Sequence, residues 1–228
     1  MNQHTVIAVD GPAAAGKTST SRALSDMFTL SYLESGRAYR TLAYEALAAG
    51  IRPDDRAAMT GLISTILQKN QSDTLFDPTR LRDSDLRTLD VSKAVSTVAK
   101  IPDLRSAITS LIHEWASHRP ASIIEGRDIG TIVFPRAQIK FFLTACAEER
   151  ATRRHRQEPG SVYETVLADV VRRDHEDTSR EASPLRPAAD SVVIDTSSLP
   201  LGQVIAMMSE VCRSAGMIEK RHTTGAAR

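Results

Sequence analysis

Residues 11–18, Gly-Pro-Ala-Ala-Ala-Gly-Lys-Thr, have the residue types and the spacing of a phosphate-binding loop. The loop follows an apolar stretch that we expect to be a buried strand, and it precedes a helical pattern. In such loops glycines let backbone N–H groups point at phosphate oxygens, while the lysine reaches the outer phosphates and the hydroxyl ligates Mg²⁺. We predict a nucleoside-triphosphate site with Thr18 as metal ligand. Its residues are Gly11, Pro12, Ala13, Ala14, Ala15, Gly16, Lys17, Thr18 and Ser19.

The second candidate for chemistry is the segment of residues 123–135, IIEGRDIGTIVFP. Its apolar start predicts a short buried strand, which stops at Arg127 and Asp128 before the sequence turns apolar again at Ile129. A plain loop with an ion pair would show the same pattern. Strand ends in open α/β sheets are where ligands bind, however, so we expect these two charges to contact a ligand.

Two helical patterns carry charged side chains in line with an apolar face. At 162–180, three valines at helical spacing are continued by three charged residues. This stripe consists of Val162, Val166, Val170, Arg173, Asp177 and Arg180. A helix that leaves the core for solvent gives this pattern as readily as one that reaches a polar cleft, so the residues alone leave both alternatives open. At 103–118, Arg105 heads an apolar face, and it either extends its guanidinium to solvent or binds a ligand.

Four arginines lie within seven residues of the helix predicted at 147–157. They are Arg150, Arg153, Arg154 and Arg156. Like charges this close repel one another, so an anionic partner is expected, although a solvated charged face is the alternative. Arg150 and Arg154 are four residues apart and would share one face of the helix.

Short apolar strands alternate with helical patterns along the chain. The strands are expected at 5–10, 30–36, 122–125, 139–145 and 191–195, and the helices after the phosphate loop and at 38–50, 54–68, 91–100, 103–118, 147–157, 162–180 and 200–215. The polar stretch at 69–88 shows no period and is interpreted as a surface excursion. This alternation predicts a three-layer α/β domain with parallel strands and right-handed crossovers.

The bulk composition excludes several classes of protein. The chain has 228 residues, 41% of them hydrophobic, and a net charge of +1, which does not suggest a general nucleic-acid binder. Cys146 and Cys212 lack metal-like spacing, and we expect both to be reduced and packed as small apolar groups. Neither a signal peptide nor a membrane-spanning run is recognisable, so we expect a cytoplasmic protein.

Five motifs in a fixed order resemble bacterial cytidylate kinase, of the P-loop nucleoside-monophosphate kinase family. They are GPAAAGKTS, ESGRAYR, GRDIGTIVFP, RDHEDTSREASPLRPAAD and VIDTSSL, and the similarity runs from about Val6 to Val211. The resemblance implies transfer of the γ-phosphoryl group of ATP to CMP or dCMP with Mg²⁺. It also implies a P-loop kinase fold with a five-stranded parallel sheet, closed by a mobile lid and a monophosphate-binding segment. Glu34 and Arg37 depart from the family, which usually has Asp and a small residue there, and the 69–88 stretch is shorter than the usual insert.

The resemblance also implies how the chain is divided. A single P-loop kinase domain covers 1–228, with its core at about 4–36, 119–147 and 188–216. The monophosphate-binding segment is expected at about 37–118, the lid at about 148–186 and a frayed tail at 217–228. The implied partners are ATP and CMP or dCMP, with no nucleic acid and no membrane, and the chain is expected to act as a monomer.

The same resemblance assigns roles to individual side chains. The substrate-binding set is Ser35, Arg40, Ser96, Arg105, Arg127, Asp128, Arg173, Asp177 and Arg180. Within it, Ser35, Arg40 and Arg127 contact the phosphate of CMP, and Ser96, Arg105 and Asp128 the cytosine. Asp177 holds the ribose hydroxyls, and Arg173 and Arg180 reach the ribose, base or phosphate. The catalytic set is Lys17, Arg127, Arg150 and Arg154.

Cytosine fits a carboxylate and a guanidinium because it offers an amino donor at N4 and acceptors at N3 and O2. Uracil reverses the N4/N3 pattern, which would leave buried groups unpaired at about 1–3 kcal/mol each. A kinase for another monophosphate such as UMP has no need of Asp128 and Arg105 together. A non-catalytic nucleotide switch or an RNA-binding module, the alternative from another class, has no obvious use for the arginine-rich helix.

Overall fold

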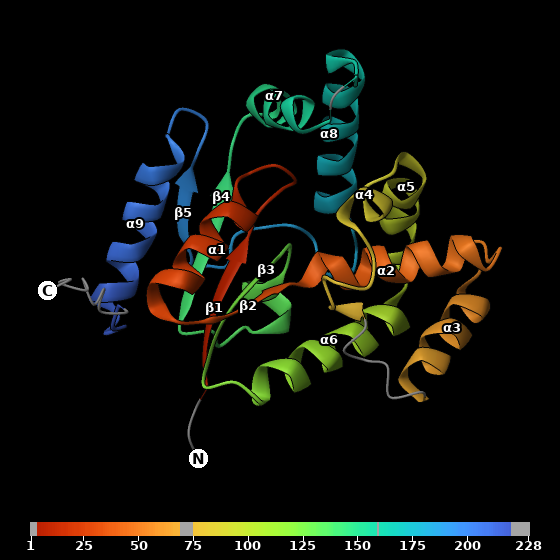
Figure 1. The fold of residues 1–228 in the computed structure, drawn as a ribbon, viewed down its shortest axis with the longest axis horizontal. Coiled ribbons are helices and arrows are strands. Elements are labelled where there is room, and N and C mark those ends of the chain that lie inside the picture. The colour runs from red at the N-terminus through yellow and green to blue at the C-terminus, as the bar shows by residue number, and fades with distance from the viewer. Residues whose placement is uncertain (1–3, 69–74, 159, 220–228) are drawn as a thin grey trace, which may run out of the picture.

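The computed structural model describes residues 4–68, 75–158 and 160–219. Five parallel strands form one sheet in the order β2-β3-β1-β4-β5 (Figure 1). They are β1 (Thr5–Asp10), β2 (Ser31–Glu34), β3 (Ala121–Gly126), β4 (Ile139–Thr144) and β5 (Val192–Asp195). The predicted five-stranded parallel α/β fold is thereby confirmed.

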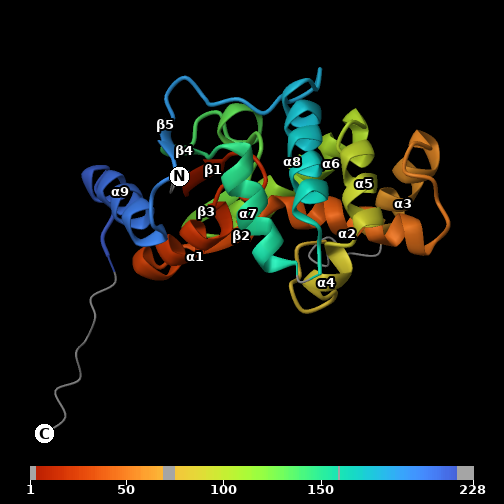
Figure 2. The same cartoon turned by 90° about the horizontal axis from the view of Figure 1, so that it is seen from above.

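Helices cover both faces of the sheet. They are α1 (Lys17–Phe28), α2 (Ser35–Ala48), α3 (Arg56–Gln68), α4 (Asp83–Leu86), α5 (Leu89–Val98), α6 (Pro102–Ser117), α7 (Ala147–Gln157), α8 (Tyr163–Thr178) and α9 (Leu201–Ser214). Alternate residues of β1 belong to opposite cores: Val6 and Ala8 are part of the cluster that α2, α3, α5 and α6 also join, and Ile7 and Val9 of the cluster that α1 and α9 join. Figure 2 shows the two helical layers on either side of the sheet. Burial on both faces explains why β1 has no polar alternation.

The strands end together at the edge of the sheet over which α7 and α8 lie (Figure 1). Asp10 at the end of β1 is in register with Gly126 at the end of β3, and Glu34 of β2 with Glu125. The phosphate loop and the Arg127–Asp128 pair therefore leave the sheet side by side. This is the edge where open α/β sheets bind ligands.

A π-helical turn, η2 (Ile129–Val133), follows β3 and was not predicted. Asp10 anchors it by accepting hydrogen bonds from the backbone N–H groups of Ile129 at 2.8 Å and Gly130 at 2.7 Å. Burial raises the pKa of Asp10 to about 6, against the lowering effect of those two bonds. Asp10 thus fixes the backbone directly after Asp128.

The prediction of a surface excursion at 69–88 is only partly right: 78–80, 82–84 and 87–88 are exposed, but three apolar side chains are not, and residues 69–74 lie outside the described residues. Leu75, Phe76 and Leu86 are buried in the core. Arg37, itself 5% exposed, holds this segment because its guanidinium donates to the carbonyl of Asp77 at 3.0 Å and to the carboxylate of Asp83 at 2.6 Å. One buried arginine thus ties α4 to α2.

Two smaller expectations also need correction. Val162 is 60% exposed because it precedes α8, so the apolar stripe of that helix starts at Val166. Cys146 is exposed at the N-cap of α7, whereas Cys212 is buried as expected. The end of the predicted tail, 220–228, lies outside the described residues. No helix in the described ranges is long and apolar enough to cross a membrane.

Candidate active site

The phosphate loop curls tightly over the neighbouring strand. Gly11 has φ +149°, and a Cβ atom there would lie 2.0 Å from the carbonyl oxygen of Leu143 in β4. Only glycine allows that approach. The loop ends at Gly16, which is left-handed and is the N-cap of α1, so the first backbone N–H groups of the helix face the cavity described below.

Lys17 is buried in the loop, and its ammonium donates to the carbonyl oxygens of Gly11 at 2.9 Å and Pro12 at 2.8 Å. Burial, and next the positive charge of Arg127, lower the pKa of Lys17 to about 7. Anionic phosphate groups at this position would offset both effects. Lys17 is therefore placed where a negatively charged ligand gains most from it.

Thr18 faces a carboxylate that sequence reasoning did not single out. Its hydroxyl donates to Oε1 of Glu125 at 2.7 Å, and the hydroxyl of Tyr32 donates to the same oxygen at 2.7 Å. The other oxygen of Glu125, Oε2, is buried and has no hydrogen-bond partner among the described residues. Within those residues no group of three or more His, Cys, Asp or Glu side chains is arranged so that it could hold a metal ion by itself. A hard cation held by one hydroxyl, one carboxylate and ligand phosphates fits this arrangement.

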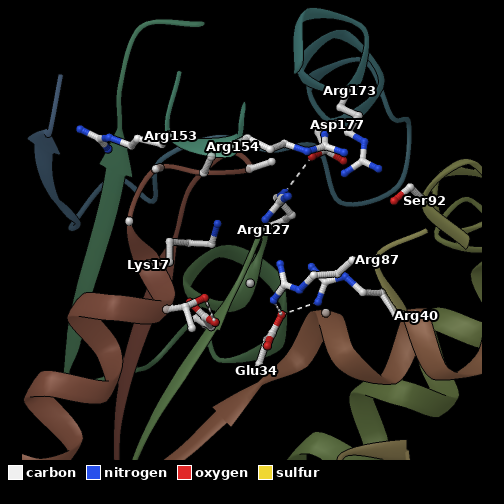
Figure 3. A pocket seen from close by; sticks show the side chains of 18 of the residues that line it. Lys17, Glu34, Arg40, Arg87, Ser92, Arg127, Arg153, Arg154, Arg173 and Asp177 are labelled. Carbon is white, nitrogen blue, oxygen red and sulfur yellow. Dashed lines mark hydrogen bonds and ion pairs between the residues drawn. The ribbon is translucent and has the colours of Figure 1, made fainter. Parts of the chain in front are cut away.

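Arg127 and Asp128 are neighbours in sequence, but their side chains pair with different partners. The Nε of Arg127 donates to Oδ2 of Asp177 at 2.7 Å (Figure 3), and Arg180 lies 3.2 Å from the other oxygen of Asp177. Burial alone would raise the pKa of Asp177, but the charges of Arg127 and then Arg180 outweigh it and hold the pKa below its usual range. The β3 end is thus linked to α8.

Asp128 pairs with Arg105 of α6, and both side chains are more than nine-tenths buried. Arg105 also donates to the carbonyl of Ala99 at 3.2 Å, and its guanidinium lies 5.7 Å from the centroid of the Tyr39 ring. A buried donor and acceptor side by side provide the pattern that a base edge with both kinds of group requires.

The N-terminus of α2 carries a third polar group of residues. Ser35 donates to the carbonyl of Glu125 at 2.7 Å, and Gly126 is needed there because a Cβ would lie 2.7 Å from the Ser35 hydroxyl oxygen. Arg40 pairs with Glu34, and Arg87 lies 3.9 Å from the same Glu34 oxygen (Figure 3). Burial would raise the pKa of Glu34, but Arg40 and then Arg87 hold it below its ordinary value.

The arginines of α7 divide into a buried one and three on the cavity wall. Arg150 does not line the cavity: it donates to the carbonyl of Ala145 at 2.8 Å and to the carboxylate of Asp174 at 2.8 Å. The side chains that line the cavity are Arg153, Arg154 and Arg156. Although Arg150 and Arg154 are four residues apart, only Arg154 faces the cavity.

Asp169 of α8 contacts three arginines. Its carboxylate pairs with Arg154 and Arg172, and the Nε of Arg173 lies 3.1 Å away. Burial and the positive charges around it lower the pKa of Arg173 to about 10. Two further carboxylates complete this network, because Arg154 also pairs with Glu158 at 2.8 Å and Arg172 with Glu176 at 2.7 Å, so three arginines face three carboxylates.

One cavity of about 960 Å³ brings most of the predicted residues together. Its wall includes Ala13, Ala14, Ala15, Gly16, Lys17, Thr18, Ser19, Ser35, Arg40, Ser96, Arg105, Arg127, Asp128, Arg154, Arg173, Asp177 and Arg180. Gly11, Pro12 and Arg150 are the predicted residues outside it. Arg105, Asp128 and Asp177 thus share a cavity with the phosphate loop.

Sequence reasoning missed several residues of this wall. They are Glu34, Tyr39, Arg87, Ser92, Glu125 and Glu176. Glu125 had a usable signal, because it directly precedes Gly126-Arg127-Asp128 at a strand end. No pattern near Arg87 indicates that α4 brings it beside Arg40, because that placement depends on the distant Arg37.

Comparisons with known proteins agree with the resemblance. The family model described as Cytidylate kinase matches residues 7–214. A cytidylate kinase of Mycobacterium leprae (strain Br4923) is 40% identical over 212 residues, 91% of this chain and 95% of that protein. Another, of Nocardia farcinica (strain IFM 10152), is 40% identical over 214 residues, 90% and 92% of the two chains. The crystal structure of an uncharacterized protein from Eubacterium ventriosum ATCC 27560 shares the fold, with a TM-score of 0.54 at 11% identity over 92% of this chain and 99% of that one.

Proposed function

This chain belongs to the cytidylate kinase family, and from that premise we propose how its cleft carries out the reaction. The chain is an enzyme that transfers the γ-phosphoryl group of ATP to CMP or dCMP, giving ADP and CDP or dCDP. The observation that carries the assignment of the acceptor is the buried Arg105–Asp128 pair in the cavity of the phosphate loop. A UMP kinase, a nucleotide switch or an RNA-binding module would not need that pair.

The donor occupies the side of the cavity nearest α1. The phosphates lie on the backbone N–H groups of residues 13–19 with Lys17 at the outer ones, and the adenine lies near Leu199, Leu201 and Thr196, which line the same cavity. The ammonium of Lys17 bonds to the carbonyls of Gly11 and Pro12 in the free enzyme, and it turns from them to the phosphates when ATP binds.

Mg²⁺ would be held by the Thr18 hydroxyl and by Glu125, whose Oε2 has no hydrogen-bond partner among the described residues. When bound, the ion neutralises charge on the transferred group and aligns the phosphates. Tyr32 keeps Glu125 in place by donating to Oε1. Binding of the metal through these residues is part of the proposal.

The acceptor lies between α2, α6 and α8. Asp128 accepts from the cytosine amino group and Arg105 donates to the ring, with Ser96 beside them, while Ser35 and Arg40 bind the phosphate. The ribose hydroxyls contact Asp177, with Arg173 and Arg180 alongside. Both substrates are anions, so orientation by fixed guanidiniums lowers the entropic cost of bringing them in line.

The transferred group passes between Lys17 and Arg127, with Arg154 as the lid arginine that approaches it. No strong general base is required, because the acceptor is already a phosphate oxygen. Arg150 is reassigned from direct contact to positioning, since it joins α7 to Asp174 of α8. The proposed lid is 148–186 and the proposed monophosphate-binding segment is 37–118. We further propose that the enzyme is a cytoplasmic monomer that binds no nucleic acid. It would take part in pyrimidine nucleotide metabolism.

Two variants test the division of the cavity into a donor and an acceptor side. Lys17→Met should weaken ATP binding while CMP affinity stays within about twofold of the unmodified enzyme, and Arg105→Met should do the reverse. Titration calorimetry of each ligand against each variant measures both. Loss of ATP and CMP affinity together in a folded Arg105→Met protein would contradict the proposed division.

A further inference from the structure

Arg87 at the C-cap of α4 has no assigned role, although it lines the cavity. Within residues 4–68, 75–158 and 160–219 its guanidinium makes no side-chain hydrogen bond, and its nearest carboxylates, Glu34 and Asp83, are both 3.9 Å away. An arginine that faces a cavity without a hydrogen-bond partner has its fork of donors free for an anion.

The position of Arg87 relative to Arg40 suggests which anion it binds. Both guanidiniums approach the same oxygen of Glu34, Oε1, from two different helices (Figure 3). One acceptor oxygen therefore already lies between two arginines. A phosphate group carries several acceptor oxygens and up to two negative charges, so it can engage both forks where a single carboxylate oxygen can fully engage one.

Arg87 is held in this position by the structure of the short segment around α4. Arg37, buried in α2, bonds to the carbonyl of Asp77 and to the carboxylate of Asp83, which is four residues before Arg87. The backbone N–H of Arg87 closes α4 by donating to the carbonyl of Ser84. The guanidinium of Arg87 thus projects from an element that is tied to the same helix that carries Arg40.

We propose that Arg87 is a further substrate-binding residue, which binds the 5′-phosphate of the acceptor nucleotide together with Arg40. The inference rests on the proposed function, because it takes the acceptor to be a nucleoside monophosphate. Glu34 keeps the two guanidiniums apart and oriented in the free enzyme, and the phosphate then bonds to the donors that Glu34 leaves free. Recognition by Arg87 is specific to the phosphate and independent of the base.

The test compares CMP with cytidine, which has the same base and sugar but no phosphate. In Arg87→Ala, the dissociation constant of CMP should rise about tenfold, the loss expected for one charge-assisted hydrogen bond at a half-exposed site. The dissociation constant of cytidine, measured by NMR titration, and that of ATP should stay within about twofold. Arg87→Lys, which keeps the charge but loses the fork, should recover part of the CMP affinity.

Arg82→Ala is the matched control, because Arg82 lies on the same segment, is 83% exposed, pairs with Asp85 and does not line the cavity. It removes the same charge and should change CMP affinity less than twofold. Equal effects of the two substitutions, or an equal loss of cytidine and CMP affinity in Arg87→Ala, would overturn the inference. Failure of the unmodified enzyme to phosphorylate CMP would instead refute the proposed function, so the two failures are distinguishable.

Discussion

Replacing Asp128 by Asn tests the base-reading pair directly. The Arg105 and Asp128 side chains are 9% and 8% exposed, so Arg105 would keep a neutral acceptor but lose its buried countercharge. We expect the free energy of unfolding to fall by about 2 kcal/mol, the usual contribution of a hydrogen bond to a charged group. Asn can also donate to the O4 of uracil. Because each mispaired group costs about 1–3 kcal/mol, the ratio of kcat/KM for CMP to that for UMP should fall by about 10- to 100-fold.

The measurements are urea unfolding for stability and a coupled assay of ADP release with each acceptor. Asp103→Asn is the matched control, because Asp103 pairs with Arg56 on the surface, where the side chains are 50% and 62% exposed. That substitution should lower stability by less than about 1 kcal/mol and leave the CMP to UMP ratio unchanged. An unchanged ratio in a folded Asp128→Asn enzyme would refute the reasoning, whatever happened to its stability.

Three further substitutions test the frame of the site. Gly11→Ala should abolish ATP binding in titration calorimetry, because its Cβ would lie 2.0 Å from the backbone oxygen of Leu143; normal ATP affinity would contradict the described loop. The pKa of Asp10 is about 6 in the folded state and 3.8 ordinarily. At pH 5 the folded state therefore holds a proton on Asp10 that the unfolded state lacks. This makes the free energy of unfolding about 1 kcal/mol larger at pH 5 than at pH 7. Asp10→Asn should lack that difference in urea unfolding, and its persistence would exclude Asp10 as the source. Glu125→Gln should raise the dissociation constant of Mn²⁺, a spectroscopic substitute for Mg²⁺, in the ATP complex at least tenfold by electron paramagnetic resonance, and an unchanged constant would remove Glu125 from the metal site.

The elements that position the site were predictable because they depend on local patterns. The spacing of the phosphate loop and the apolar strands on either side of it require no knowledge of distant residues. The end of β3 was predictable for the same reason, since a strand that stops at two charges already indicates a ligand-binding edge. The residues of α8 alone, however, left open whether Asp177 faces solvent or a cleft.

The parts that were missed depend on tertiary pairing. Arg150 and Arg154 look equivalent in sequence. In the structure, however, the guanidinium of Arg150 pairs with Asp174 of α8 and does not line the cavity. The segment that includes α4 looked like a polar loop, whereas in the structure Arg37 binds its polar groups while Leu75 and Leu86 are buried. Buried arginines that satisfy backbone carbonyls leave no periodic signal in the sequence.

The central claim is that one cavity holds a pyrimidine monophosphate, selected by Arg105 and Asp128, facing the triphosphate loop. The most direct measurement is the release of ADP from ATP with CMP, dCMP, UMP, AMP and GMP as acceptors under identical conditions. The account predicts efficient turnover of CMP or dCMP and values of kcat/KM at least tenfold lower for the other three. Equal turnover of all five acceptors would contradict it.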